Sequence, residues 1–168
     1  MNELLKNTWI DSNELFLATL HTLETPEGIQ AGRALYLSHA QDGNGKLLDG
    51  HSDWLIAGHE KPAYPLRFLL HSRSADRLHY MITGSGPDHD KKLGVSRNGY
   101  VGLYRHASVD DYLKVEPLAW EGDALVCRLR DHLGHEFKAS HDVAAERIRF
   151  SYMNVTQGMP LRFLIRRA

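Results

Sequence analysis

Three stretches of this sequence combine aromatic rings with carboxylate, amide and imidazole side chains. An aromatic face packs on the C–H face of a sugar ring, and carboxylates and amides bind its hydroxyls, so this mixture suits a carbohydrate ligand. The candidate binding residues of the first stretch are Asp49, His51, Asp53, Trp54 and His59. Those of the second are Asn98, Tyr100, Tyr104 and His106. Those of the third are His141, Asp142, Tyr152, Asn154 and Gln157.

The first stretch is favoured as a binding site, because it joins Trp54 to two carboxylates and two histidines. Trp54 also fits a position in a core. A regular feature links the stretches, since His59, His106 and Asn154 each lie seven positions before a leucine of a recurring strand-like segment. These three polar groups either contact a ligand or satisfy the backbone of their own loops.

Catalytic and metal chemistry are less well supported by the pattern. The chain has eleven histidines, but they are scattered, and the closest group, His132, His135 and His141, straddles a predicted hairpin whose alternate side chains face opposite ways. Cys127 falls within a predicted strand and reads as an unreactive core thiol. We therefore expect no catalytic residues, no metal site and no cofactor.

Composition limits the classes of protein that remain. The chain of 168 residues has length for one domain, and its 42% hydrophobic content argues against disorder. A net charge of −1 gives no pull toward nucleic acid or acidic membranes. We predict no signal peptide and no membrane span, and hence a cytoplasmic protein, with export by a route that reads no N-terminal signal as the alternative.

A strand-like pattern recurs along the chain at nearly equal intervals. Pro65–Leu70 returns as Pro160–Ile165, and Tyr112–Glu116 lies about midway between them. Each copy alternates apolar and basic residues, which is the period of a half-buried strand. Dipeptides such as Asn98-Gly99 favour the tight turns of hairpins. The pattern predicts an all-β chain of repeats of about 45 residues.

We expect twelve strands in three pseudo-symmetric repeats, at residues 33–72, 73–119 and 120–168. The first and last repeats look alike and carry no polar cap, which favours a closed barrel over a solenoid. Residues 1–32 are left as an N-terminal extension, in which Glu14–Leu20 reads as an extra strand or as a first strand paired with 33–39. The predicted core consists of Leu35, Leu37, Phe68, Leu70, Met81, Val115, Val126, Phe163 and Ile165.

With these segments in place, the chain resembles the β-trefoil superfold, and within it fascin-like domains. The resemblance is carried by residues 124–137, which read as a strand, a His-Leu-Gly turn and a second strand, and by Pro160–Ile165. It covers about residues 33–167 and implies one shallow loop pocket in each repeat, where the candidate binding residues lie. The Gln-x-Trp motif of ricin-type trefoil lectins is absent.

The leading hypothesis is a non-enzymatic, lectin-like module that binds a glycan. The first alternative is a protein-interaction module of the fascin-like type, with a protein partner. The second is a small-molecule enzyme that uses loop histidines as acid–base groups, and three or more of His51, His59, His106 and His141 lining one deep cavity would favour it. Nucleic acid is not an expected partner, and the oligomeric state is left open.

Overall fold

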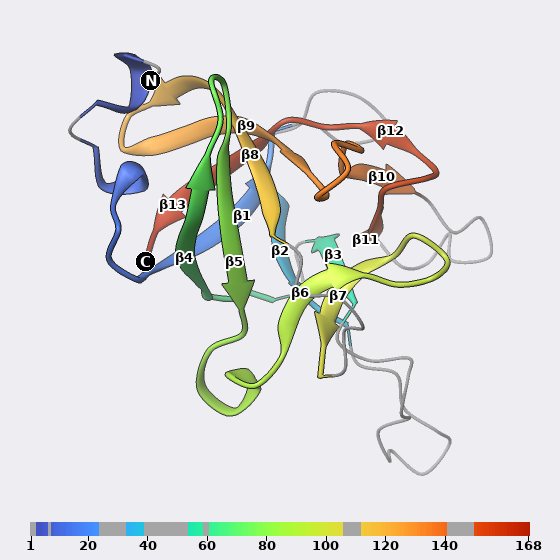
Figure 1. Ribbon diagram of the computed structural model, residues 1–168. Coiled ribbons are helices and arrows are strands. Elements are labelled where there is room, and N and C mark those ends of the chain that lie inside the picture. Colours follow the sequence, from blue (N-terminus) through green and yellow to red (C-terminus); the bar gives the residue numbers. More distant parts are fainter. Residues whose placement is uncertain are drawn as a thin grey trace, which may run out of the picture.

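The computed structural model describes residues 3–6, 8–23, 33–38, 54–58, 61–105, 112–140 and 150–168, and these form an all-β structure. Thirteen strands join in one connected antiparallel sheet (Figure 1). The only helices in these ranges are three short 3-10 turns, η1 (Glu3–Leu5), η2 (Trp9–Asp11) and η3 (Gly86–Asp88). The all-β class predicted from the alternation of apolar residues is confirmed.

Six strands close into a ring. They are β1 (Phe16–Thr22), β4 (Leu66–Arg73), β5 (Leu78–Thr83), β8 (Leu113–Glu121), β9 (Ala124–Arg130) and β13 (Phe163–Arg167). Each pairs antiparallel with the next in that order, and β13 pairs with β1 to complete the circuit. Because the ring is closed, none of its strands offers an unpaired edge over the paired residues.

The remaining strands lie between successive ring strands as hairpins. β2 (Arg33–Leu37) pairs with β3 (Leu55–Gly58), β6 (Lys92–Val95) pairs with β7 (Val101–Tyr104), and β10 (Lys138–Ser140) pairs with β11 (Phe150–Asn154). The short strand β12 (Met159–Pro160) adds to β10. β11 also pairs with β3, so two of the hairpins are hydrogen-bonded to each other.

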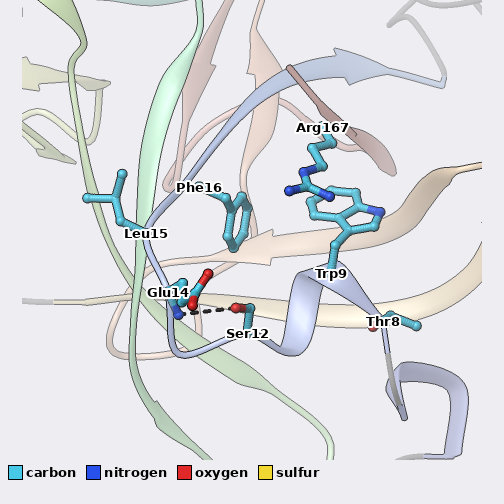
Figure 2. A pocket seen from close by; sticks show the side chains of 7 residues that line it. All are labelled: Thr8, Trp9, Ser12, Glu14, Leu15, Phe16 and Arg167. Carbon is cyan, nitrogen blue, oxygen red and sulfur yellow. Dashed lines mark hydrogen bonds between the residues drawn. The ribbon is translucent and has the colours of Figure 1, made fainter.

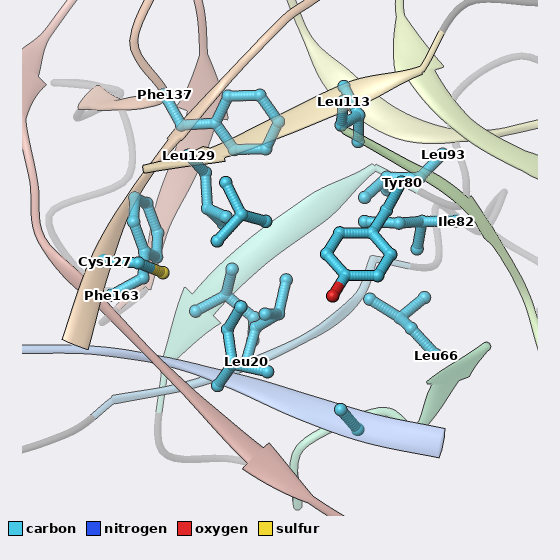
Figure 3. Close-up of a cluster of buried hydrophobic side chains, with 14 of the residues drawn as sticks. Leu20, Leu66, Tyr80, Ile82, Leu93, Leu113, Cys127, Leu129, Phe137 and Phe163 are labelled. Carbon is cyan, nitrogen blue, oxygen red and sulfur yellow. The ribbon is translucent and has the colours of Figure 1, made fainter. Parts of the chain in front are cut away.

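Alternate residues of the ring strands fill its interior (Figure 3). Leu20, Tyr80 and Phe163 come from three different ring strands and are almost wholly buried, and Phe137, which lies just before β10, packs against Phe163 with its ring centroid 6.3 Å away. Close packing of such large side chains from every strand makes the ring a filled core and not a channel.

The N-terminal segment covers one end of the ring. The Tyr80 hydroxyl donates a hydrogen bond to the backbone oxygen of Ile10, and the Trp120 indole N–H donates to the backbone oxygen of Leu4 at 2.8 Å. The Trp9 ring meets Phe16 edge-on, with 5.3 Å between centroids. Residues 4–10 are thus tied to the core by side chains of β5 and β8.

The expected β-trefoil and its fascin-like or lectin-like resemblance are wrong. The structure has thirteen strands in one continuous sheet with a six-strand ring, where twelve strands in three lobes were expected. In the N-terminal part of the chain the ring strands are β1, at 16–22, and β4, at 66–73, whereas β2, at 33–37, lies off the ring. The recurring segments at 66, 113 and 163 do supply ring strands β4, β8 and β13.

Two predicted core residues face differently from expected. Met81 is only half-buried, since Leu78, Tyr80 and Ile82 are the inward residues of β5. Val126 belongs to a small separate cluster with Ala124 and Leu164, and its neighbour Cys127 points into the core. If β5 and β9 are aligned one residue out of register, the predicted face of every side chain in one of them is reversed. This shift explains the error.

The role of β1 in the ring can be tested with two adjacent substitutions. Ala18 is wholly buried, whereas Leu17 is 41% exposed. Ala18→Asp buries an unpaired carboxylate, and we expect it to lower the free energy of unfolding by about 4 kcal/mol or more. Leu17→Asp, the matched control, should cost under about 1 kcal/mol in urea unfolding followed by fluorescence. Equal losses in the two variants would contradict the placement of β1.

Candidate functional site

Three of the sequence-predicted binding residues converge on one cluster of aromatic rings. Trp54 immediately precedes β3, Tyr100 immediately precedes β7, and Tyr152 lies in β11. The Trp54 and Tyr100 rings stack in parallel at 4.6 Å between centroids, with 4° between their planes. Tyr152 meets both edge-on, at 5.6 and 5.9 Å. We call Trp54, Tyr100 and Tyr152 the aromatic cluster.

The backbone brings the three rings together. An isolated bridge pairs Trp54 with Gly102 of β7, and a second pairs Tyr100 with Asn154 of β11. Tyr152 is paired with Ile56 in the ladder between β11 and β3. The aromatic cluster therefore sits where the three hairpins meet, and all three side chains are half-buried.

Asn154 holds the loop beside the cluster and is itself buried. Its Oδ1 accepts hydrogen bonds from the backbone N–H and the hydroxyl of Thr156, both at 2.7 Å, and from the backbone N–H of Gln157 at 3.1 Å. Its Nδ2 donates to the backbone oxygen of Asn98 at 3.4 Å. The sequence left two roles open for this recurring polar position, contact with a ligand or hydrogen bonding to the backbone of its own loop. The observed contacts of Asn154 are of the second kind.

Gly99 is required at this junction. Its φ of +86° lies in the left-handed region, and a Cβ there would fall 2.7 Å from Asn154 Oδ1 and from the Thr156 hydroxyl. Its carbonyl oxygen accepts the backbone N–H of Val155 at 2.9 Å. The Asn98-Gly99 turn, chosen from the sequence as a hairpin signal, thus lets two hairpins approach closely.

The other described candidates surround the cluster in different ways. The Tyr104 hydroxyl donates to the backbone oxygen of Tyr100 at 2.9 Å, and burial raises the pKa of Tyr104. Asn98 and Gln157 are exposed on the loops that follow β6 and β11. The remaining candidates lie outside the described residues, and they are Asp49, His51, Asp53, His59, His106, His141 and Asp142.

A second polar cluster was not singled out from the sequence. The Ser72 hydroxyl lies 2.8 Å from Nδ1 of His79 and 2.9 Å from Nδ1 of His71. The Tyr112 ring stacks on both imidazoles, at 4.6 and 4.9 Å between centroids. A hydroxyl has one proton, so Ser72 can donate to only one of the two imidazoles and must accept from the other if both bonds form, and it can also accept from both. The irregularity between Leu70 and Ser72 in the β4–β5 ladder creates this arrangement, and simple alternation does not predict it.

Asp131 and Glu136, the acidic neighbours of His132 and His135, serve the turn between β9 and β10, while His141 lies outside the described residues. Asp131 accepts the backbone N–H groups of Leu133 and His135, and its other oxygen is 2.9 Å from His135 Nδ1. Glu136 pairs with Arg128 at 2.9 Å. Over the described ranges, no three histidine, cysteine or acidic side chains gather as metal ligands. Cys127 is buried, and burial raises the pKa of its thiol.

No family model and no curated protein matches this chain. Within the part of the chain that the structure describes, no helix has the length and apolarity to cross a membrane.

The loop role of Asn154 predicts a measurable loss of stability. Asn154→Ala leaves the N–H groups of Thr156 and Gln157 without their acceptor, and we expect a loss of about 1–3 kcal/mol in the free energy of unfolding. Asn154→Asp retains Oδ1 as acceptor and is the control, with a smaller loss in the same denaturant titration. A neutral Asn154→Ala variant would exclude this role.

Stability should also fall in mild acid, because two half-buried or buried histidines resist protonation. Burial, together with Lys114, His71 and Arg77, lowers the pKa of His79 below 6.5, and burial with Arg166 nearby lowers that of His21. The unfolded chain then binds more protons than the folded one. The contribution of these two histidines to the free energy of unfolding is therefore complete above pH 6.5. It is lost as the pH falls toward the folded-state pKa values.

Urea titrations between neutral and mildly acidic pH measure this decline. His79→Asn removes the titrating ring while keeping a polar group near Ser72, and it should flatten the dependence on pH. His89→Gln, at an exposed position, is the matched control and should leave the slope as in the wild type. An unchanged slope in His79→Asn would refute the assignment.

Proposed function

We propose that this protein is a non-enzymatic carbohydrate-binding module whose ligand packs on the aromatic cluster. The observation that supports this function is the convergence of Trp54, Tyr100 and Tyr152 from three separate hairpins while each ring stays half-exposed. Saccharides present apolar C–H faces between their hydroxyl groups, and a partly exposed aromatic surface complements such faces.

The neighbouring polar groups suit the same ligand. The exposed amides of Asn98 and Gln157 lie on the loops that border Tyr100 and Asn154, and an amide both donates to and accepts from sugar hydroxyls. Neither side chain takes part in the hydrogen bonds that hold the loop, which use the Asn98 carbonyl and the Gln157 backbone N–H. Both side chains therefore remain available to a ligand.

A purely structural role for the aromatic cluster would favour full burial. The aromatic residues that serve the core are buried in this way, since Phe68, Tyr80 and Phe163 have no exposed surface. The rings of the aromatic cluster differ, because each keeps a solvent-accessible part although it lies at a junction of three hairpins. Partial exposure at a rigid junction provides a preorganised surface for a ligand.

A glycan array followed by titration calorimetry tests the proposal. For a saccharide that binds, Trp54→Ala should weaken the affinity by about tenfold, since one aromatic contact contributes about 1–1.5 kcal/mol. Trp54→Phe keeps an aromatic face and should lose less. Trp120→Phe, which alters a tryptophan that contacts the N-terminal segment, should bind as the wild type does.

Two results would reject carbohydrate binding at this cluster. One is a broad saccharide panel in which nothing binds the wild-type protein at about millimolar concentration, which corresponds to roughly −4 kcal/mol. The other is a Trp54→Ala variant that remains folded by circular dichroism and binds with unchanged affinity. If that variant unfolds, the Trp54→Phe variant takes its place. The change in tryptophan fluorescence on adding the saccharide is then compared between Trp54→Phe and the wild type.

A further inference from the structure

A group of polar and basic side chains lies on the outer face of the ring, where β4, β5 and β8 run side by side. Ser72 of β4 is paired with His79 of β5, and His79 is paired with Lys114 of β8. Leu113 and Val115, the neighbours of Lys114 in β8, are buried in the core, so alternation turns Lys114 outward. Directly opposed residues of adjacent strands have Cβ atoms about 5 Å apart. Ser72, His79 and Lys114 therefore form one row across three strands.

His71 and Tyr112 complete this group. His71 is the extra residue at the irregularity in β4, and its Nδ1 lies 2.9 Å from the Ser72 hydroxyl. Tyr112 lies two residues before Lys114, and its ring stacks on His79 at 4.6 Å and on His71 at 4.9 Å between centroids. The stacking fixes both imidazoles beside the row. We call His71, Ser72, His79, Tyr112 and Lys114 the basic cluster.

Over the described residues, every charged group that shifts the pKa of His79 is basic. Burial lowers this pKa most, and Lys114, His71 and Arg77 lower it further by repelling the imidazolium. Lys114 is itself half-buried, and it forms no hydrogen bond or ion pair with another described residue. Charges near a protein surface interact more strongly than charges in bulk water, so this gathering of like charges favours a bound anion.

The carboxylates described on the adjoining elements leave this charge in excess. Glu116 lies on the same face of β8, but it pairs with Arg130 at 2.8 Å. Asp76 is 3.9 Å from Nε of Arg77, and 70% of its side chain is exposed, so that ion pair is weak. The aspartates at 110 and 111 lie outside the described residues. Within the described part of the chain, the basic cluster thus carries positive charge that no carboxylate offsets.

The hydrogen bonds of the two imidazoles can leave the Ser72 proton free for a ligand. Nε2 of His79 is buried and has no hydrogen-bond partner among the described residues. A buried N–H without an acceptor is rarely tolerated, so we place the His79 proton on Nδ1, from which it donates to Ser72 at 2.8 Å. Protonated His71 donates to Ser72 as well. The Ser72 oxygen then accepts from both rings, and its own O–H points elsewhere.

From this arrangement, we infer that the basic cluster is a binding site for a tetrahedral oxyanion, a phosphate or sulfate group. Its oxygens accept hydrogen bonds from the Ser72 hydroxyl, from Nε2 of protonated His71 and from the Lys114 ammonium. The flexible four-carbon stem of Lys114 lets its ammonium reach along the row toward Ser72. His79 is a positioning residue, because it holds Ser72 and does not contact the anion. The same positive charge repels a metal cation, although two imidazoles lie close together.

The basic cluster is separate from two other surface features. The aromatic cluster involves β3, β7 and β11, whereas the basic cluster lies on β4, on β5 and at the start of β8 (Figure 1). A cleft of about 330 Å³ beside the N-terminal segment has Trp9, Glu14 and Arg167 in its lining (Figure 2). That cleft has one acidic and one basic side chain, so it lacks the excess of one charge that marks the basic cluster.

Isothermal titration calorimetry of the full chain with sodium sulfate and with sodium phosphate tests the inference, with sodium chloride holding the ionic strength constant. The wild type should bind both anions at about millimolar concentration. We expect the dissociation constant to rise about tenfold or more in His71→Asn and in Lys114→Gln, because each variant loses a charged donor. Ser72→Ala removes a neutral donor and should weaken binding less. Glycerol 3-phosphate, titrated in parallel, shows whether a phosphate monoester or the free ion is the better ligand.

The dependence of binding on pH tests the role of the imidazoles. Sulfate keeps its charge between about pH 7.5 and 6, so a change in its affinity over this range reports protonation of the protein. A bound anion favours the charged form of both imidazoles, and sulfate should therefore bind more tightly as the pH falls. The pKa of His79, measured by NMR titration, should rise when sulfate is added. A His79 that only packs against Tyr112 would show no such rise.

The controls change the same chemistry at other places. Lys138→Gln alters a half-buried lysine of β10, and His89→Gln alters an exposed histidine. Arg167→Gln removes the basic side chain of the cleft. All three variants should bind sulfate as the wild type does, with circular dichroism confirming that every variant is folded.

Four outcomes would overturn the inference. These are no binding of either anion by the wild type, equal affinity in the wild type and in both His71→Asn and Lys114→Gln, binding that weakens as the pH falls, or a loss of binding in Arg167→Gln alone, which would move the site to the cleft. None of these outcomes bears on saccharide binding at Trp54, because the basic cluster shares no residue with the aromatic cluster.

Discussion

The structure depends on the closure of a six-stranded antiparallel ring around its own side chains. β1 completes the ring by pairing with β4 on one side and with β13 on the other. Pairing on both sides satisfies the backbone polar groups, and the inward residues then pack large side chains such as Tyr80 and Phe163 into one core. Without β1, two ring strands would be left with exposed edges, and the N-terminal segment would lose its attachment to Tyr80.

Ring closure also determines where the hairpins meet. The hairpins between ring strands meet one another because β3 pairs with β11 and isolated bridges join Trp54 to Gly102 and Tyr100 to Asn154. Their meeting point is the aromatic cluster. On the outer surface of the ring, the strand register places Leu17 of β1 and Leu69 of β4 on the same outward face.

The aromatic cluster has a structural role beside the binding role that we propose for it. Asn154 and Gly99 fix the loop next to Tyr100, and the stacked rings of Trp54 and Tyr100 add packing between two of the hairpins. A rigid platform of this type reduces the entropy lost when a ligand binds. The same coupling means that substitutions in the cluster affect stability and binding together, which is why conservative replacements are the informative ones.

The amino-acid sequence by itself determined the all-β class, the location of strands near Leu66, Leu113 and Phe163, and a set of candidate residues that included Trp54, Tyr100 and Tyr152. Alternation of apolar and polar residues carries this information, because it reports that a segment is extended and half-buried. It does not report which strand is the partner, so Glu14–Leu20 was left as either an extra strand or a first strand paired with 33–39, and a trefoil was expected where a different thirteen-strand sheet exists. The alternation also does not resolve a shift of one residue in the alignment of two strands. Such a shift placed Met81 in the predicted core, although its side chain is only half-buried and that of Cys127 is buried. Only the tertiary structure decided which rings meet, that His71 and His79 share Ser72, and that Leu17 and Leu69 lie on the same outward face, since each depends on strand pairing that the sequence does not report.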